Sequence, residues 1–87
     1  MQRIDLDGLP PAERTWAVGD PGQRGYVEIR IGKVDQYRWY AARIGHGATK
    51  VRIVYDERQA YDVIQPWIDR RGGIRQWREI KPAPELP

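Results

Sequence analysis

Cationic and aromatic side chains alternate through the middle of this 87-residue sequence. Tyr37, Trp39 and Arg43 stand at odd-numbered positions of one segment, and Lys50 and Arg52 at even-numbered positions of the next. The guanidinium of arginine is a planar fork of donors that fits phosphate oxygens, and an exposed ring can stack on a base. If these side chains share one face, they form a surface suited to a polyanion.

Groups that perform catalysis are scarce in comparison. The sequence contains no Cys and no Ser, which excludes thiolate metal sites, Cys nucleophiles and a Ser–His–Asp triad. The only histidine, His46, stands between two glycines, a position typical of an exposed turn. The carboxylate pairs Asp5/Asp7 and Asp56/Glu57 lack a second cluster that would complete a metal site. We therefore expect a protein that is not an enzyme and needs neither a metal nor a cofactor.

The net charge of +3 is unevenly distributed along the chain. Residues 1–23 carry a net −2, whereas residues 24–81 carry 13 basic and 7 acidic side chains, a net +6. Arginine outnumbers lysine 12 to 3. A GC-rich genome explains that ratio without any ligand, but it does not explain why the basic groups are segregated. The local field over the central segments therefore favours an anionic partner.

Three segments are predicted to form the strands that position these side chains. Residues 26–31 alternate between apolar and polar types, residues 37–44 are rich in aromatics, and residues 50–55 alternate again. Short links containing glycine join them, which favours an antiparallel meander. Residues 14–18 and 74–80 are candidates for additional strands.

A helix is predicted after the third strand. Asp56 can cap its start, and Gly72 and Gly73 can end it. Because Pro66 has no N–H to donate, it predicts either a kink or two abutting helices. The expected fold is α+β, with a three- to four-stranded antiparallel sheet and one kinked helix packed on one face. The apolar stripe of this helix would consist of Ala60, Val63, Ile64, Trp67 and Ile68.

The chain is expected to form one small domain over residues 1–87. Residues 1–13 would be an irregular lead-in, residues 14–80 the folded core, and residues 81–87 a flexible tail. The sequence shows neither an apolar segment of the kind a signal peptide needs nor a stretch of membrane-spanning length. We therefore expect a cytoplasmic protein without membrane contact.

Strand alternation also assigns a face to each side chain. Val27, Ile29 and Ile31 are expected to point toward the helix, in company with Tyr40, Ala42, Ile44, Val51, Ile53 and Tyr55. A register shift by one residue would instead bury Trp39 and expose Tyr40. Without such a shift, the face away from the helix would carry Tyr26, Glu28, Arg30, Tyr37, Trp39, Ala41, Arg43, Lys50, Arg52 and Val54.

The favoured interpretation is a small DNA-binding accessory or regulatory protein, from an Arg-rich, phage-like genome, that uses this basic and aromatic sheet face. A narrow ribbon of strands can also enter the major groove of DNA. The alternative is a protein-interaction module that binds and modulates a larger enzyme or complex, because Tyr, Trp and Arg also dominate protein interfaces. A third interpretation is an unliganded surface whose cations protect the sheet against pairing. The candidate nucleic-acid-binding residues are Arg30, Tyr37, Trp39, Arg43, Lys50, Arg52, Arg70, Arg71 and Arg75.

In layout, about half of the chain resembles the arm-type DNA-binding domain of tyrosine recombinases. Gly25 to Arg30 looks like the first strand of that domain, and the aromatic run from Tyr37 to Arg43 like the second. The third strand leads through Asp56 into the helix, as in the family. The resemblance implies three antiparallel strands packed on one helix, and a sheet that enters the major groove.

A second similarity is to WGR domains, which bind nucleic-acid ends. It is carried by Trp39, Arg43, Ile44 and Gly45. Both resemblances imply a nucleic-acid partner, and both depend on the same predicted strand.

Overall fold

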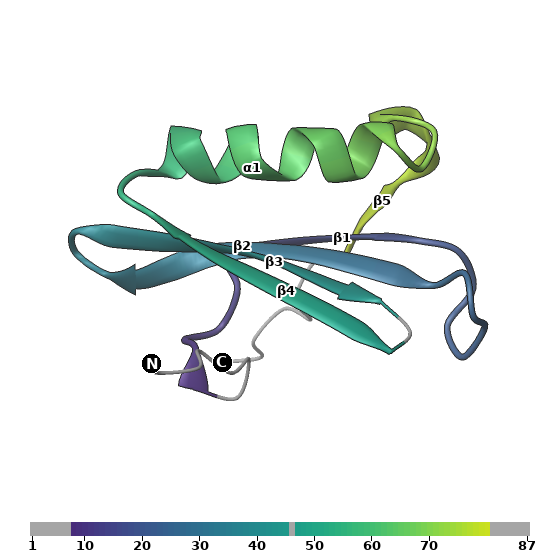
Figure 1. The fold of residues 1–87 in the computed structure, drawn as a ribbon, viewed down its shortest axis with the longest axis horizontal. Coiled ribbons are helices and arrows are strands. Elements are labelled where there is room, and N and C mark those ends of the chain that lie inside the picture. Colours follow the sequence, from purple (N-terminus) through teal and green to yellow (C-terminus); the bar gives the residue numbers. More distant parts are fainter. Residues whose placement is uncertain (1–7, 46, 81–87) are drawn as a thin grey trace, which may run out of the picture.

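The computed structural model describes residues 8–45 and 47–80. Within this part the chain folds into a sheet with one α-helix packed against it, so the predicted α+β class is confirmed (Figure 1). The predicted flexible tail, 81–87, and the predicted turn residue His46 lie outside the described residues. The elements are β1 (Arg14–Val18), β2 (Val27–Asp35), β3 (Arg38–Gly45), β4 (Ala48–Val54), α1 (Glu57–Asp69), the 3₁₀ helix η2 (Ile74–Gln76) and β5 (Arg78–Ile80).

The sheet has five strands in the order β4-β3-β2-β1-β5, and every neighbouring pair is antiparallel. Strands β2, β3 and β4 form the predicted meander. The sheet is larger than predicted because β1 pairs with β2 and then receives β5 on its other side. Helix α1 lies across one face of this sheet (Figure 1). No helix in the described ranges is long and apolar enough to cross a membrane.

Helix α1 begins where the sequence predicts. The Asp56 carboxylate accepts a hydrogen bond of 2.8 Å from the backbone N–H of Gln59, and the Gln59 side chain accepts one of 2.9 Å from the N–H of Tyr55. The first bond satisfies an N–H that the first turn leaves without a helical partner, and the second satisfies the N–H of the residue just before the cap. The helix buries one apolar side against the sheet, through Ala60, Ile64 and Ile68.

Pro66 lies inside α1, and the helix continues through it. Of the two predicted outcomes, two abutting helices are therefore not formed. Pro66 and Asp62 are both exposed, so the Asp62 carbonyl that loses its helical donor lies on the solvent side of the helix. After the helix, the N–H of Gly73 donates to the carbonyl of Ile68 at 3.1 Å, with Gly72 and Gly73 both at positive φ, as a glycine-terminated helix requires.

The predicted assignment of faces is wrong for β3 and β4. Residues directly opposite each other in an antiparallel pair point to the same face. Ile31 pairs with Ala41, and Ile29 with Arg43, so the odd-numbered residues of β3 face α1. In β4 the even-numbered residues stand opposite the odd-numbered residues of β3 and therefore also face α1. They are Lys50, Arg52 and Val54. The phase of β3 is therefore that of the register shift weighed as the alternative, although Trp39 is only partly buried and Tyr40 stays buried.

Tyr40 is 2% exposed although it points away from the helix. Its ring lies over Gly32, the residue opposite it on β2. Its hydroxyl donates a hydrogen bond of 2.8 Å to the backbone carbonyl of Pro10. The described part of the lead-in thus packs on the second face of the sheet. Because both faces of β3 are covered over Trp39 to Ala42, both alternating sets of side chains carry apolar or aromatic residues there, and their sequence pattern does not reveal which set faces the helix.

We expect Tyr40 to weaken the protein at alkaline pH. Burial raises the pKa of its hydroxyl above the ordinary value of 10.0. The unfolded chain therefore loses this proton first, so the contribution of Tyr40 to stability is complete below pH 10.0 and is lost as pH rises through the higher folded pKa. Denaturant unfolding measured from neutral to strongly alkaline pH should show a shallower loss of stability for Tyr40→Phe than for the wild-type chain. The pKa of Tyr26 is raised in the same direction, so the slope should flatten only in part. Parallel curves for the two proteins would contradict this expectation.

Candidate functional site

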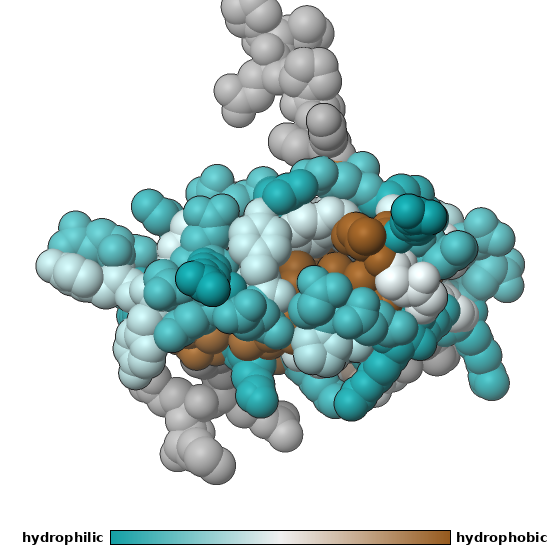
Figure 2. All heavy atoms as spheres, turned by 90° about the horizontal axis from the view of Figure 1, so that it is seen from above, coloured by the Kyte–Doolittle hydropathy of each residue, from teal (hydrophilic) through white to brown (hydrophobic). Residues whose placement is uncertain are grey.

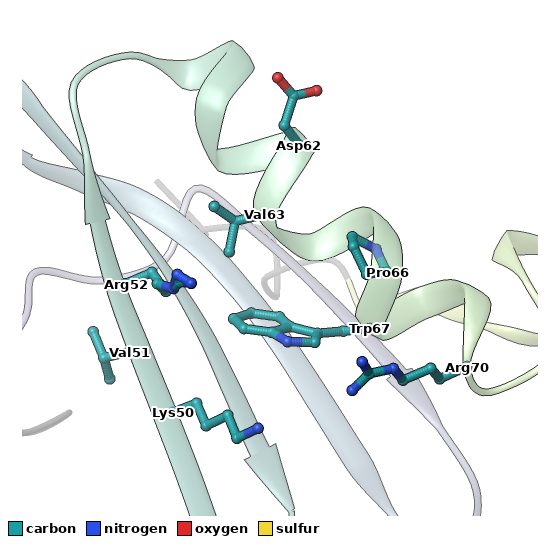
Figure 3. A pocket seen from close by; sticks show the side chains of 8 residues that line it. All are labelled: Lys50, Val51, Arg52, Asp62, Val63, Pro66, Trp67 and Arg70. Atoms are coloured by element: carbon teal, nitrogen blue, oxygen red, sulfur yellow. The ribbon is translucent and has the colours of Figure 1, made fainter.

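A groove lies between α1 and the edge strand β4 (Figure 3). Its volume is about 580 Å³. We call it the basic groove and define it by its lining residues, which are Lys50, Val51, Arg52, Asp62, Val63, Pro66, Trp67 and Arg70.

Strand β4 supplies two of the cations of the groove. Lys50 and Arg52 are both exposed and are separated by one residue, so they stand on the same side of the strand, about 6.7 Å apart along it. Arg43 of β3 lies directly opposite Lys50 and therefore faces the same way. Among the described strands β4 pairs only with β3, which leaves its outer edge open.

Helix α1 supplies the other wall of the groove. Val63, Trp67 and Arg70 follow one another at intervals of four and three residues, so they line one side of the helix. Trp67 is partly buried against the hydrophobic core. Its indole ring extends from the helix toward β4, and Figure 3 shows it between Arg52 and Lys50. The groove therefore combines one ring with cations from both walls.

The groove is positively charged. Lys50, Arg52 and Arg70 line it together with one carboxylate, that of Asp62. Figure 3 shows this carboxylate directed away from Lys50 and Arg52. Within residues 8–45 and 47–80, ion pairs form at Arg14–Glu79, Arg30–Glu28 and Arg38–Asp35, and none includes a cation of the groove or Arg43. These cations are thus available to an external anion.

The structure brings together four of the nine candidate residues. Arg43, Lys50 and Arg52 share a face, as predicted, but this face is the one that α1 partly covers. Arg70 joins them from the end of the helix. Trp39 lies on the same face but packs against the core, with the Lys33 ammonium 5.9 Å from its ring centroid.

The other candidates lie elsewhere. Arg30 is on the face away from the helix, where it forms an ion pair of 2.9 Å with Glu28. Tyr37 is 71% exposed in the turn between β2 and β3. Arg71 donates a hydrogen bond of 2.7 Å to the carbonyl of Gly25, and Arg75 is exposed in η2.

Sequence reasoning did not identify Trp67 as part of the site. It placed this residue in the core stripe of the helix, and the ring does pack against the core. Trp67 is also the member of the stripe that lies three residues before Arg70, on the side of the helix that faces β4. Recognising this from sequence would have required the correct phase of β4, since only then do Lys50 and Arg52 lie beneath the helix.

A second hollow of about 500 Å³ lies on the other side of α1, against β1 and β5. Figure 2, seen from the helix side, shows hydrophobic atoms exposed to the right of centre. One wall of this hollow is a polar cluster, in which Arg14 donates two bonds of 2.9 Å to the Glu79 carboxylate and one of 2.6 Å to the Tyr61 hydroxyl. The pKa of the Arg14 guanidinium is raised as a result. Unlike the cations of the basic groove, Arg14 is already bound within the protein.

Comparison with protein-family models, with curated proteins and with solved structures gave no match. The interpretation of the site therefore depends on its own geometry and charge.

Proposed function

We propose that this protein binds nucleic acid through the basic groove, as a non-catalytic accessory or regulatory protein. One observation carries the proposal. Lys50, Arg52 and Arg70 line one groove beside the edge strand β4, Arg43 stands opposite Lys50 on β3, and none of the four takes part in the ion pairs of the described residues.

Phosphate groups are the ligands best suited to these cations. A charge-assisted hydrogen bond from Arg or Lys to a phosphate is stronger than a neutral one, and binding releases counterions from the nucleic acid. Arg30 illustrates the contrast, because a phosphate would have to replace Glu28, which holds this guanidinium at 2.9 Å. The groove cations have no such carboxylate to displace among the described residues, so they can contribute their full interaction to a ligand.

The proposal is tested by titrating labelled DNA oligonucleotides, in both single-stranded and duplex form, and following fluorescence anisotropy at several salt concentrations. We expect micromolar binding of at least one form at low salt. The double variant Lys50→Ala/Arg52→Ala should bind about tenfold more weakly or worse, since it removes two cations that would bond to phosphates. For a single strand, its plot of log affinity against log salt should be shallower by roughly 1.4, or about 0.7 for each phosphate that is no longer neutralised.

Arg24→Ala is the matched control. Arg24 is exposed in the loop between β1 and β2, outside the groove, and its removal changes the net charge as much as the loss of one groove cation. Its affinity should stay close to that of the wild type. Absence of binding by both forms of DNA at low salt would overturn the proposal. Polyglutamate binding as tightly as DNA at equal salt would also overturn it, in favour of an acidic protein partner.

A further inference from the structure

We infer that the basic groove takes a single strand with unpaired bases in preference to a duplex. This inference rests on the proposed function and specifies the class of nucleic acid. Three observations lead to it, concerning the face of the sheet away from α1, the shape of the groove, and the position of Trp67.

The face away from α1 is poorly suited to enter the major groove of a duplex. Its guanidinium groups are engaged within the protein, because Arg30 pairs with Glu28 at 2.9 Å and Arg78 donates to the carbonyl of Gly19 at 2.8 Å. The Pro10 carbonyl lies against the same face, bonded to the Tyr40 hydroxyl. The opposite face is partly covered by α1 (Figure 1). Among the described residues, the unpaired cations of the sheet therefore lie beside the helix in the basic groove and at Arg43, and not on a broad free face of the kind that inserts into the major groove of a duplex.

The size and position of the groove suit one extended chain. It lies between one helix and one strand, and its volume of about 580 Å³ is that of a cleft for small ligands and chain segments. Lys50 and Arg52 stand about 6.7 Å apart along β4, which suits successive phosphates of an extended strand. The outer edge of β4 is open among the described strands, so a chain can enter from the side without being threaded.

Trp67 distinguishes the two forms of nucleic acid. An indole can stack on a base only if that base is free of its neighbours, and the bases of a duplex already stack on one another. Trp67 projects from α1 into the space between the cations of β4 (Figure 3). A single strand whose phosphates lie on Lys50 and Arg52 can turn a base toward this ring, whereas a duplex can use only the cations.

The experiment compares a single strand of mixed sequence with the duplex of the same sequence, on the full chain, by fluorescence anisotropy at fixed salt. We expect the single strand to bind about tenfold more tightly or better. Trp67→Leu keeps apolar bulk against the core but removes the ring. It should weaken single-strand binding by about 5- to 150-fold, the range that loss of one base–aromatic stack gives. Duplex binding should change by less than about twofold.

Trp67→Phe serves as the second variant, because it keeps an aromatic face and is the milder change to the core. It should preserve most of the preference for the single strand, and circular dichroism will establish whether each variant is folded. Equal affinity for both forms, with both sensitive to Lys50→Ala/Arg52→Ala, would overturn the inference and leave the proposed function standing. Equal weakening of both forms by a folded Trp67→Leu variant would also overturn it. Failure of both forms to bind the wild-type chain would overturn the proposed function itself.

Discussion

Trp77→Ala is expected to reduce the free energy of unfolding by about 3–5 kcal/mol, as truncation of a buried tryptophan commonly does. Trp77 is 7% exposed and belongs to the hydrophobic core, next to the C-terminal end of α1. Its indole N–H also donates a hydrogen bond of 3.1 Å to the carbonyl of Ile68. The substitution therefore opens a cavity at the point where β5 and η2 meet the helix. Since a domain of this size has a total stability of about 5–15 kcal/mol, the loss is a large part of the whole.

Thermal unfolding by circular dichroism measures this effect. The unfolding midpoint of Trp77→Ala should fall on the order of 20 °C. Trp77→Phe is the control, because it keeps an aromatic ring in the core while it removes the N–H and part of the bulk of the indole. The Ile68 carbonyl also accepts bonds from the N–H groups of Arg71 and Gly73, so it is not left without a donor. We therefore expect Trp77→Phe to cost about 1–2 kcal/mol. Equal midpoints for the alanine and phenylalanine variants would show that the packing of Trp77 contributes little.

The second large effect is expected at the contact between Gly32 and Tyr40. A Cβ atom at position 32 would lie 2.7 Å from the Tyr40 hydroxyl oxygen and equally close to its ring, which is a steric clash. Gly32 does not have a positive φ, so alanine fits the backbone, and the clash is the whole cost. Tyr40 is fully buried and bonded to Pro10, so moving its ring loses packing and a hydrogen bond. We expect Gly32→Ala to destabilise the protein by about 1–3 kcal/mol.

A double-mutant cycle isolates this contact. Tyr40→Ala alone should destabilise by about 3–5 kcal/mol, since it removes a buried ring from a central strand. Once that ring is absent, adding Gly32→Ala should be neutral or stabilising by about 0.4–1 kcal/mol, because alanine restricts the unfolded chain more than glycine does. Denaturant unfolding of the four proteins gives the coupling free energy. Additive effects of the two substitutions would refute the contact.

The same pair of residues shows why the sequence predicted the elements better than their faces. The helix carries its own signals, with Asp56 at its start and glycines after its end, and both act within a few residues. The face of a strand depends instead on what covers it, and this is decided by distant segments. Tyr40 is buried on the side away from the helix, where Pro10, thirty residues earlier, accepts a hydrogen bond from its hydroxyl. The register between β2 and β3 also shifts at a β-bulge between Lys33 and Asp35. Alternation along β2 therefore cannot simply be continued into β3 to assign the faces of its side chains.

The candidate site was predictable in part for a related reason. Positions two apart on one strand must share a face, so the grouping of Lys50 with Arg52 follows from sequence alone. Which partners they meet depends on the phase of the strand, so Trp67 and Arg70 of α1 could be added only from the structure. Arg30 shows the reverse case. Its alternation with apolar residues correctly predicted that it lies on the face away from the helix. The sequence did not show that Glu28, two residues away on the same strand, forms an ion pair with its guanidinium there.

The open edge of β4 also bears on the solubility of the protein. An unpaired edge strand is a template on which a second copy of the chain can add its own β4. In an antiparallel pairing centred on Val51, Lys50 of each copy would stand opposite Arg52 of the other, and like charges directly opposite each other destabilise such pairs. The cations that we propose to bind phosphates should thus also disfavour edge-to-edge pairing of the free protein. A bound polyanion would cancel that repulsion, so concentrated complexes should be more prone to self-association than the free chain.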